Sequence, residues 1–128
     1  MAIVGIGTEI VECVRIAKMI ETHGDQFLAR VYSPGEIETC LSHPNATQRF
    51  ATRWAAKESV IKAMRCHRQG IRWAEIEIDG GGPGRDGPAV VLSGKAAWWA
   101  TRSGIVSFHL SLAACRTHAT AYVIAVDE

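Results

Sequence analysis

The sequence lacks the marks of several common protein classes. No apolar run approaches the roughly 18 residues that a membrane-spanning helix needs, and the N-terminus has no basic segment of the kind that opens a secretion signal. The 4 cysteines form no CxxC pair and no paired metal-binding spacing. We therefore expect a protein outside the membrane, with reduced thiols and a cytoplasmic location.

Further absences narrow the chemistry. The 5 histidines form no HExxH pattern, and no GxSxG sequence provides a nucleophile for covalent catalysis. Gly5 and Gly7 lack the third glycine of a dinucleotide-binding loop, so we expect them to allow another backbone to approach closely. A net charge of +1 excludes a strongly basic nucleic-acid binder, and any basic patch has to be local.

The composition that is present fits one globular domain spanning residues 1–128, because 48% of the residues are hydrophobic and 21% are charged. Ser33 to Glu36 matches a capping box, and Gly80 to Gly87 reads as a turn or flexible loop. Periodicity predicts helices over 11–22, 26–31, 34–43 and 94–99, and a long helix that is capped at Asn45 or Thr47 and ends at Met64. It predicts strands over 2–10, 73–78, 89–92, 106–112 and 118–126. The fold class is therefore α+β, with a small, mostly antiparallel sheet packed on a long helix.

The long helix carries the most informative pattern. Arg49, Arg53 and Lys57 recur every four residues and share one face, and Glu58 and Lys62 form a second i,i+4 pair beside them. This mixture of charges is expected where phosphate oxygens and a divalent metal are held together. The alternative is a solvated helix face, although cations one turn apart repel each other and so favour an anionic partner. Apolar positions suited to a core are Phe50, Trp54, Ile61 and Met64.

Two carboxylates stand out as candidate metal ligands. Glu9 lies near the end of the first predicted strand, and Glu58 lies within the cationic helix. If they meet across a cleft, they suit Mg²⁺, which takes a few protein oxygens and completes its shell with water and phosphates. Spacing alone favours a plainer interpretation, in which Glu9 caps the first helix and Glu58 pairs with Lys62. Both interpretations are open at this point.

Five segments of the chain resemble the holo-acyl-carrier-protein synthase family. The segment of residues 50–63 resembles the most specific motif of that family, and residues 3–12 with Arg15 and Ile16 resemble its N-terminal motif. The other segments, in the family's order, are residues 27–36, 92–94 and 109–112. The resemblance covers essentially the whole chain.

The resemblance implies a phosphopantetheinyl transferase fold and a homotrimer with active sites between neighbouring subunits. It implies transfer of 4′-phosphopantetheine from coenzyme A to a serine of apo acyl carrier protein, with adenosine 3′,5′-bisphosphate released. Mg²⁺ is then expected on Glu9 and Glu58, and the catalytic residues are expected to be Glu58 and Lys62. The residues expected at coenzyme A are Arg49, Arg53, Lys57 and Lys62. The residues expected to dock the carrier are Arg15, Lys18, Met19 and Arg30.

The chain departs from the family pattern at three places. Glu9 replaces the usual aspartate, residues 65–68 replace a Gly-Thr-Gly sequence, and Ala113 with Ala114 replaces a Ser/Thr-His pair. These departures leave a second interpretation open, a divergent paralogue that binds coenzyme A or the carrier protein without catalysis.

Overall fold

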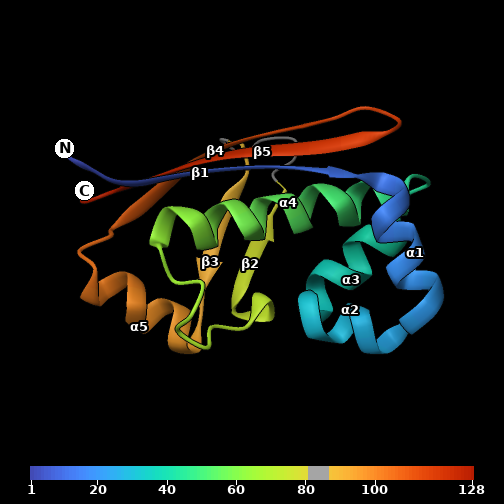
Figure 1. The fold of residues 1–128 in the computed structure, drawn as a ribbon, viewed down its shortest axis with the longest axis horizontal. Coiled ribbons are helices and arrows are strands. Elements are labelled where there is room, and N and C mark those ends of the chain that lie inside the picture. Colours follow the sequence, from blue (N-terminus) through green and yellow to red (C-terminus); the bar gives the residue numbers. More distant parts are fainter. Residues whose placement is uncertain (81–86) are drawn as a thin grey trace.

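A long helix beneath an antiparallel sheet organises the molecule (Figure 1). The computed structural model describes residues 1–80 and 87–128. The helix is α4 (Ala46–Met64), and the strands above it are β1 (Ile3–Glu12), β4 (Ser107–Ala114) and β5 (His118–Val126). Their order is β1-β5-β4, so β5 pairs with a neighbour on both sides. The prediction that the last strand lies inside the sheet is confirmed.

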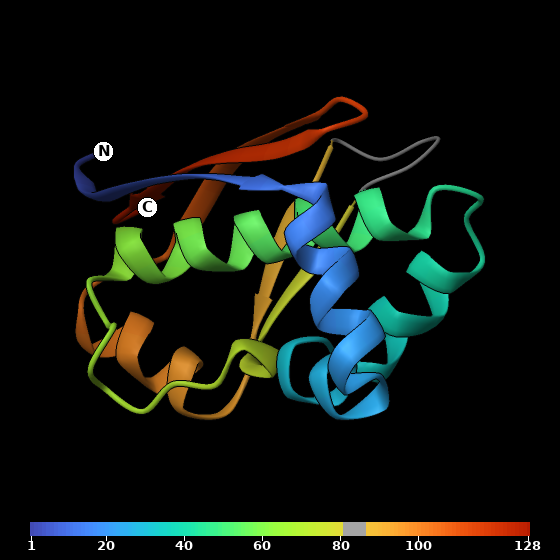
Figure 2. The same ribbon diagram turned by 45° about the vertical axis from the view of Figure 1, so that its right-hand side comes forward.

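The remaining elements pack against α4 away from the three-stranded sheet. Helices α1 (Cys13–His23), α2 (Asp25–Val31) and α3 (Pro34–Leu41) gather at one end of α4, which Figure 2 brings forward. A second sheet pairs β2 (Ile76–Asp79) with β3 (Ala89–Leu92), and α5 (Gly94–Arg102) follows it. The α+β prediction is confirmed, with the helices packed largely on one side of the main sheet.

Local sequence signals account for most element boundaries. The predicted capping box is present, because Ser33 Oγ accepts from the backbone N–H of Glu36 at 3.2 Å and Glu36 Oε1 accepts from that of Ser33 at 2.9 Å. The strand predicted over 73–78 begins only at Ile76, since Trp73–Glu75 forms a 3₁₀ turn. Of the predicted loop over 80–87, residues 81–86 lie outside the described residues.

Two glycines allow β1 to lie directly against α4. A Cβ atom on Gly5 would lie 1.9 Å from the carbonyl oxygen of Ala63, and one on Gly7 would lie 1.9 Å from that of Ser59. No side chain fits at such distances, so the predicted reason for these glycines, close backbone approach, is confirmed. The approach also carries the next inward-facing residue of β1, Glu9, to the side of α4.

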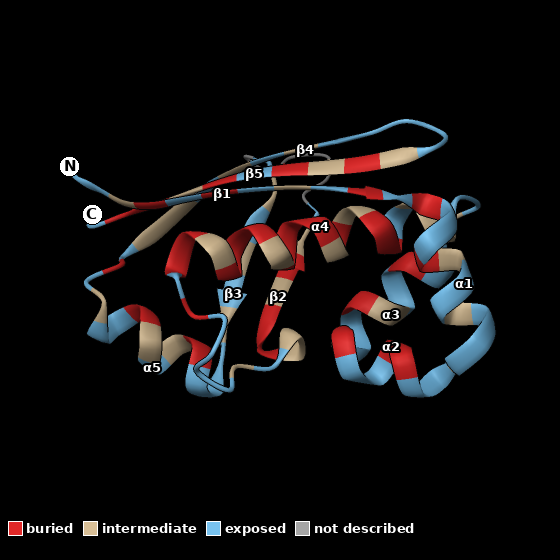
Figure 3. Ribbon diagram, viewed as in Figure 1, coloured by how far each residue is buried: buried red, intermediate tan, exposed pale blue. Residues whose placement is uncertain are grey.

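The two faces of the main sheet differ in burial. The face toward α4 is buried with the inner turns of the helix, as the red segments of Figure 3 show. On the other face, Ile6, Ile10 and Tyr122 have 60%, 64% and 60% of their surface exposed to solvent. An apolar face of this kind on a small protein is typical of an interaction surface. Among the described helices, none has the length and apolar character needed to cross a bilayer.

Candidate active site

The predicted site residues lie on two different flanks of α4. With about 3.6 residues per turn, Glu58 projects roughly 140° around the helix from Arg53. The open flank comprises Glu58 and Lys62, which are half-buried, whereas the buried flank comprises Arg53 and Lys57. The structure therefore does not bring all the predicted cations to one side of α4.

On the open flank, Lys62 is held by the covering strand. Its Nζ lies 3.2 Å from Glu9 Oε2 and donates to the carbonyl oxygen of Thr8 at 2.9 Å. The side chains of Lys62 and Glu9 remain 39% and 22% exposed, so both are accessible from solvent. The residue at the N-cap of α1 is Glu12, so the interpretation of Glu9 as a helix cap is wrong.

The second carboxylate of the open flank has a different partner. Glu58 Oε1 accepts a hydrogen bond of 2.6 Å from the indole Nε1 of Trp73. Among the described residues, no donor reaches Glu58 Oε2 and no ion pair joins Glu58 to Lys62, so the i,i+4 interpretation is also wrong. Glu9, Lys62 and Glu58 thus follow one side of α4. Two carboxylates beside an ammonium group fit the few protein oxygens that Mg²⁺ takes when phosphates complete its shell.

Glu58 borders a cleft of about 540 Å³ beyond the C-terminal half of α4. The Glu58 cleft is also lined by Arg30, Cys66, His67 and Trp73. Burial raises the pKa of the Cys66 thiol to about 11, so this thiol stays neutral at ordinary pH. The cleft therefore includes part of the 65–68 segment, at Cys66 and His67.

A second cavity adjoins the Glu58 cleft, and we call it the docking hollow after the role predicted for three of its lining residues. It measures about 320 Å³ and is lined by Arg15, Met19 and Arg30, together with Trp54 and Trp73. The guanidinium carbon of Arg15 lies 5.7 Å from the centre of the Trp54 ring, within the range of a cation–π interaction. The hollow and the cleft share Arg30 and Trp73, so they meet at these two side chains.

Three of the four predicted docking residues therefore line one hollow. The fourth, Lys18, is exposed on α1 but does not line it. The hollow combines an apolar floor with cationic edges, which suits an acidic protein surface that presents one apolar side chain.

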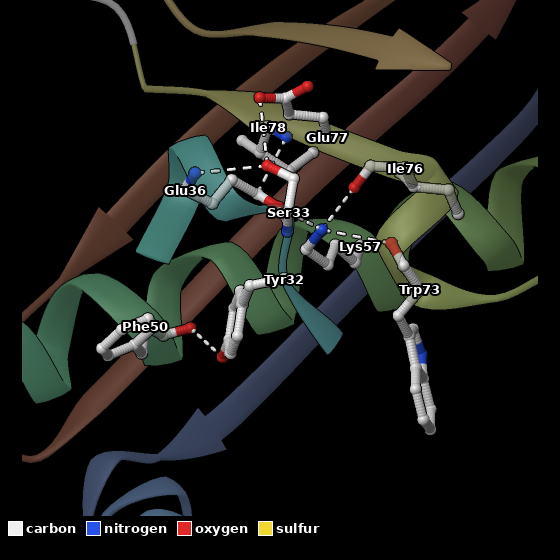
Figure 4. A network of polar contacts seen from close by, with 9 residues as sticks. All are labelled: Tyr32, Ser33, Glu36, Phe50, Lys57, Trp73, Ile76, Glu77 and Ile78. Carbon is white, nitrogen blue, oxygen red and sulfur yellow. Dashed lines mark hydrogen bonds and ion pairs between the residues drawn. The ribbon is translucent and has the colours of Figure 1, made fainter. Parts of the chain in front are cut away.

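On the buried flank, Lys57 lies in a closed network (Figure 4). Its Nζ donates to Glu36 Oε1 at 2.7 Å and to the carbonyl oxygens of Trp73 at 3.1 Å and Ile76 at 2.5 Å. Its side chain is 0% exposed, and desolvation lowers its pKa although the Glu36 carboxylate opposes that shift. All three ammonium donors are used. The structure thus corrects the assignment of Lys57 to coenzyme A: the residue ties the protein together internally.

The two arginines predicted to bind phosphate have unequal surroundings. Arg53 is buried, with its guanidinium beside Gly80, and its Nε has no hydrogen-bond partner among the described residues. A buried guanidinium with an unused donor is well suited to an anion. Arg49 is exposed, and its Nη2 lies 2.8 Å from His43 Nε2. Both arginines face away from Glu58, so one chain alone does not join them to the carboxylates.

Sequence reasoning missed Glu36 and Trp73. The capping box predicted Glu36 at a helix start, but nothing in the pattern marked it as the partner of Lys57, 21 residues away. Trp73 was predicted in a strand, and no local signal connects its indole to Glu58. Both contacts depend on how the β2 region packs against α4.

A carboxylate and a lysine on a helix, facing a second carboxylate on the covering strand, form the arrangement expected of an enzyme that acts on phosphate groups. The comparison with known families agrees with this class. The chain belongs to the 4′-phosphopantetheinyl transferase superfamily, whose family model matches residues 5–126.

Individual relatives match along nearly the whole chain. A holo-[acyl-carrier-protein] synthase of Rhodopirellula baltica is 52% identical over 127 residues, covering 99% of this chain and 100% of the relative. The holo-ACP synthase structure from Plasmodium yoelii superimposes with a TM-score of 0.83 at 30% identity, covering 99% of this chain and 97% of that one. A Helicobacter pylori synthase in complex with coenzyme A gives 0.79 at 27% identity, covering 94% and 99%.

Proposed function

We propose that the chain transfers 4′-phosphopantetheine from coenzyme A to a serine of apo acyl carrier protein and releases adenosine 3′,5′-bisphosphate. The observation that carries this proposal is the junction of the docking hollow with the Glu58 cleft at Arg30 and Trp73. A carrier seated on the hollow can extend its serine toward Glu58. The full-length similarity to holo-[acyl-carrier-protein] synthases supports the same reaction.

The open flank supplies the groups that this transfer needs. The serine oxygen attacks the phosphorus that bears pantetheine, and the bridging P–O bond of the diphosphate breaks. The Glu58 carboxylate accepts the serine proton, and Lys62 stabilises the phosphate oxygen that leaves with adenosine bisphosphate. The two contacts to Glu9 and Thr8 leave Lys62 one donor for this role.

Mg²⁺ is the cofactor that the donor set fits, with Glu9 and Glu58 as its protein ligands. When bound, it neutralises negative charge on the diphosphate during transfer. The chain's own contribution is to hold the two carboxylates on the same side of α4. Glycine at positions 5 and 7 makes that possible because β1 then lies against the helix.

We also propose that the active unit is a homotrimer. The exposed side chains of Ile6, Ile10 and Tyr122 give the sheet an apolar outer face suited to contact with another copy. Arg49 and Arg53 lie on the opposite side of α4 from Glu58, so an arginine pair from a neighbouring subunit is a way to complete the coenzyme A site. Light scattering that returns a stable monomer at micromolar concentration would contradict the trimer.

Mass spectrometry of the carrier tests the transfer. The protein is incubated with coenzyme A, Mg²⁺ and a purified apo carrier, and the carrier is expected to gain the mass of one phosphopantetheine group. Omission of coenzyme A is the control. An unchanged carrier mass, combined with measurable binding of coenzyme A, would identify the non-catalytic paralogue to which residues 65–68 and 113–114 point.

The docking surface has its own test. Arg15→Glu reverses a charge at the hollow, so the apparent KM for the carrier should rise and lose part of its salt dependence, while the KM for coenzyme A stays unchanged. The change is expected to be worth about 1 kcal/mol or less, because exposed charges are screened. Arg102→Glu on α5 is the matched control. Equal effects on both substrates would show that Arg15 supports the site itself.

A further inference from the structure

Trp73 is held at both ends by consecutive residues of α4. Its backbone carbonyl accepts from Lys57 Nζ at 3.1 Å, and its indole Nε1 donates to Glu58 Oε1 at 2.6 Å. The residue therefore joins the buried flank, through its backbone, to the open flank, through its side chain, at a single turn of the helix. It also borders both the docking hollow and the Glu58 cleft.

Lys57 anchors Trp73 from a fixed position, because all three of its ammonium donors are used inside the protein. The Lys57–Glu36 pair is fully buried, and Glu36 is itself fixed, since its Oε2 accepts from the backbone N–H of Ile78 at 3.0 Å (Figure 4). The same lysine binds the carbonyl oxygen of Ile76, so the whole turn that carries Trp73 is fastened to α4. A satisfied buried network of this kind holds its members in one arrangement.

A fixed indole determines the orientation of Glu58. A free glutamate side chain loses rotamer entropy when it is ordered on binding a metal. The hydrogen bond from Trp73 restrains Oε1 in advance and leaves Oε2 without a donor among the described residues. Ligating carboxylates are commonly held by such an outer partner, and loss of that partner typically costs 10–100-fold in metal affinity.

We propose that Trp73 is a positioning residue: it aims the carboxylate of Glu58 at the divalent metal, and the Lys57–Glu36 network holds Trp73 in place. The proposal rests on the proposed function, because Glu58 serves there as a metal ligand. It concerns a residue outside the charged pattern of α4, and it gives the buried lysine of that pattern an indirect part in catalysis.

The test compares two tryptophan variants. Trp73→Phe keeps an aromatic ring and removes the N–H donor, whereas Trp99→Phe removes an indole that donates to the carbonyl oxygen of Met64 at 2.8 Å, away from Glu58. Mn²⁺ binding is measured by electron paramagnetic resonance, with and without coenzyme A. Trp73→Phe should raise the Mn²⁺ dissociation constant about 10-fold, while Trp99→Phe leaves it unchanged. The transfer rate of Trp73→Phe should recover when the metal is saturating.

A spectroscopic readout separates positioning from general stability. In ¹H–¹⁵N spectra, the indole resonance that disappears in Trp73→Phe is assigned to Trp73, and it should shift in Glu58→Gln. Equal Mn²⁺ affinity in Trp73→Phe and the parent, or an unmoved indole resonance, overturns the proposal. A parent that binds no Mn²⁺ and modifies no carrier overturns the proposed function, and the metal-positioning role with it. In that case, a shifted indole resonance shows only that Trp73 contacts Glu58.

Discussion

The two flanks of α4 carry similar charges but use them in opposite ways. Lys57 on the buried flank is 0% exposed and donates only to groups inside the protein, whereas Lys62 on the open flank is 39% exposed and faces Glu9. The difference comes from what covers each flank, since α3 and β2 close over Lys57 whereas Lys62 contacts β1 and stays partly open to solvent. One helix thus carries both a buried structural network and a solvent-accessible ion pair, and residue type alone does not distinguish them.

The largest expected effect is the loss of the buried lysine. Lys57→Met leaves the Glu36 carboxylate buried without its partner, so the free energy of unfolding should fall by about 3–5 kcal/mol. Lys62→Met is the matched change on the open flank and should alter stability by less than about 1 kcal/mol, although it removes transfer. Chemical denaturation measures both. Adding Glu36→Gln to Lys57→Met should recover part of the lost stability, because it removes the unpaired charge. If Lys57→Met and Lys62→Met are equally stable, the two flanks do not differ in the way described.

Next in size is the loss of the carboxylate on the open flank. Glu58→Gln preserves volume but removes the charge that a hard cation needs, so transfer should fall on the order of 100-fold or more while the fold persists. Carrier mass spectrometry and circular dichroism report the two properties. Activity within a few-fold of the parent at saturating Mg²⁺ would show that Glu58 is not a metal ligand.

Glu9→Asp tests whether the longer side chain at position 9 limits the rate or is adapted to this site.

A smaller effect is expected where β1 meets α4. Gly7→Ala places a Cβ atom against the carbonyl oxygen of Ser59, so β1 must shift and the protein should lose about 1–3 kcal/mol. The shift should also separate Glu9 from Lys62 and lower transfer more than stability alone explains. Gly35→Ala is the control, because a Cβ atom there meets its nearest neighbour only at 3.4 Å. If Gly7→Ala transfers as fast as the parent, the close approach of β1 to α4 is not needed for activity.

The smallest effect concerns two thiols. Cys115 is exposed, and its hydrogen bond with Thr117 lowers its pKa below 9.0, so iodoacetamide should react there first. Cys66 in the Glu58 cleft has a pKa raised to about 11 and should remain unmodified near neutral pH, as mass spectrometry of peptides can show.

The raised pKa of Cys66 also makes stability depend on pH. In the unfolded chain Cys66 ionises near 9.0, so the free energy of unfolding should decline as pH rises from 9 to 11. Cys66→Ala should reduce that decline.

Much of the fold could be predicted because its signals are local. The capping box at Ser33, the glycines of β1 and the apolar last strand each act within a few residues, and the structure contains all three features. The candidate site was predictable only as a set of residues. Periodicity placed Arg53 and Lys57 on one face of α4, but a helix covered on several sides buries charged residues wherever a partner is supplied.

The amino-acid sequence by itself determined the order of the elements, the close passage of β1 over α4 and the residue types available for phosphate chemistry. Only the tertiary structure decided which charge meets which partner. Glu58 bonds to a side chain 15 residues away, and Lys62 to a carbonyl 54 residues away. Helical and strand periodicities relate neighbours within about four residues, so contacts at these separations depend on how whole elements pack.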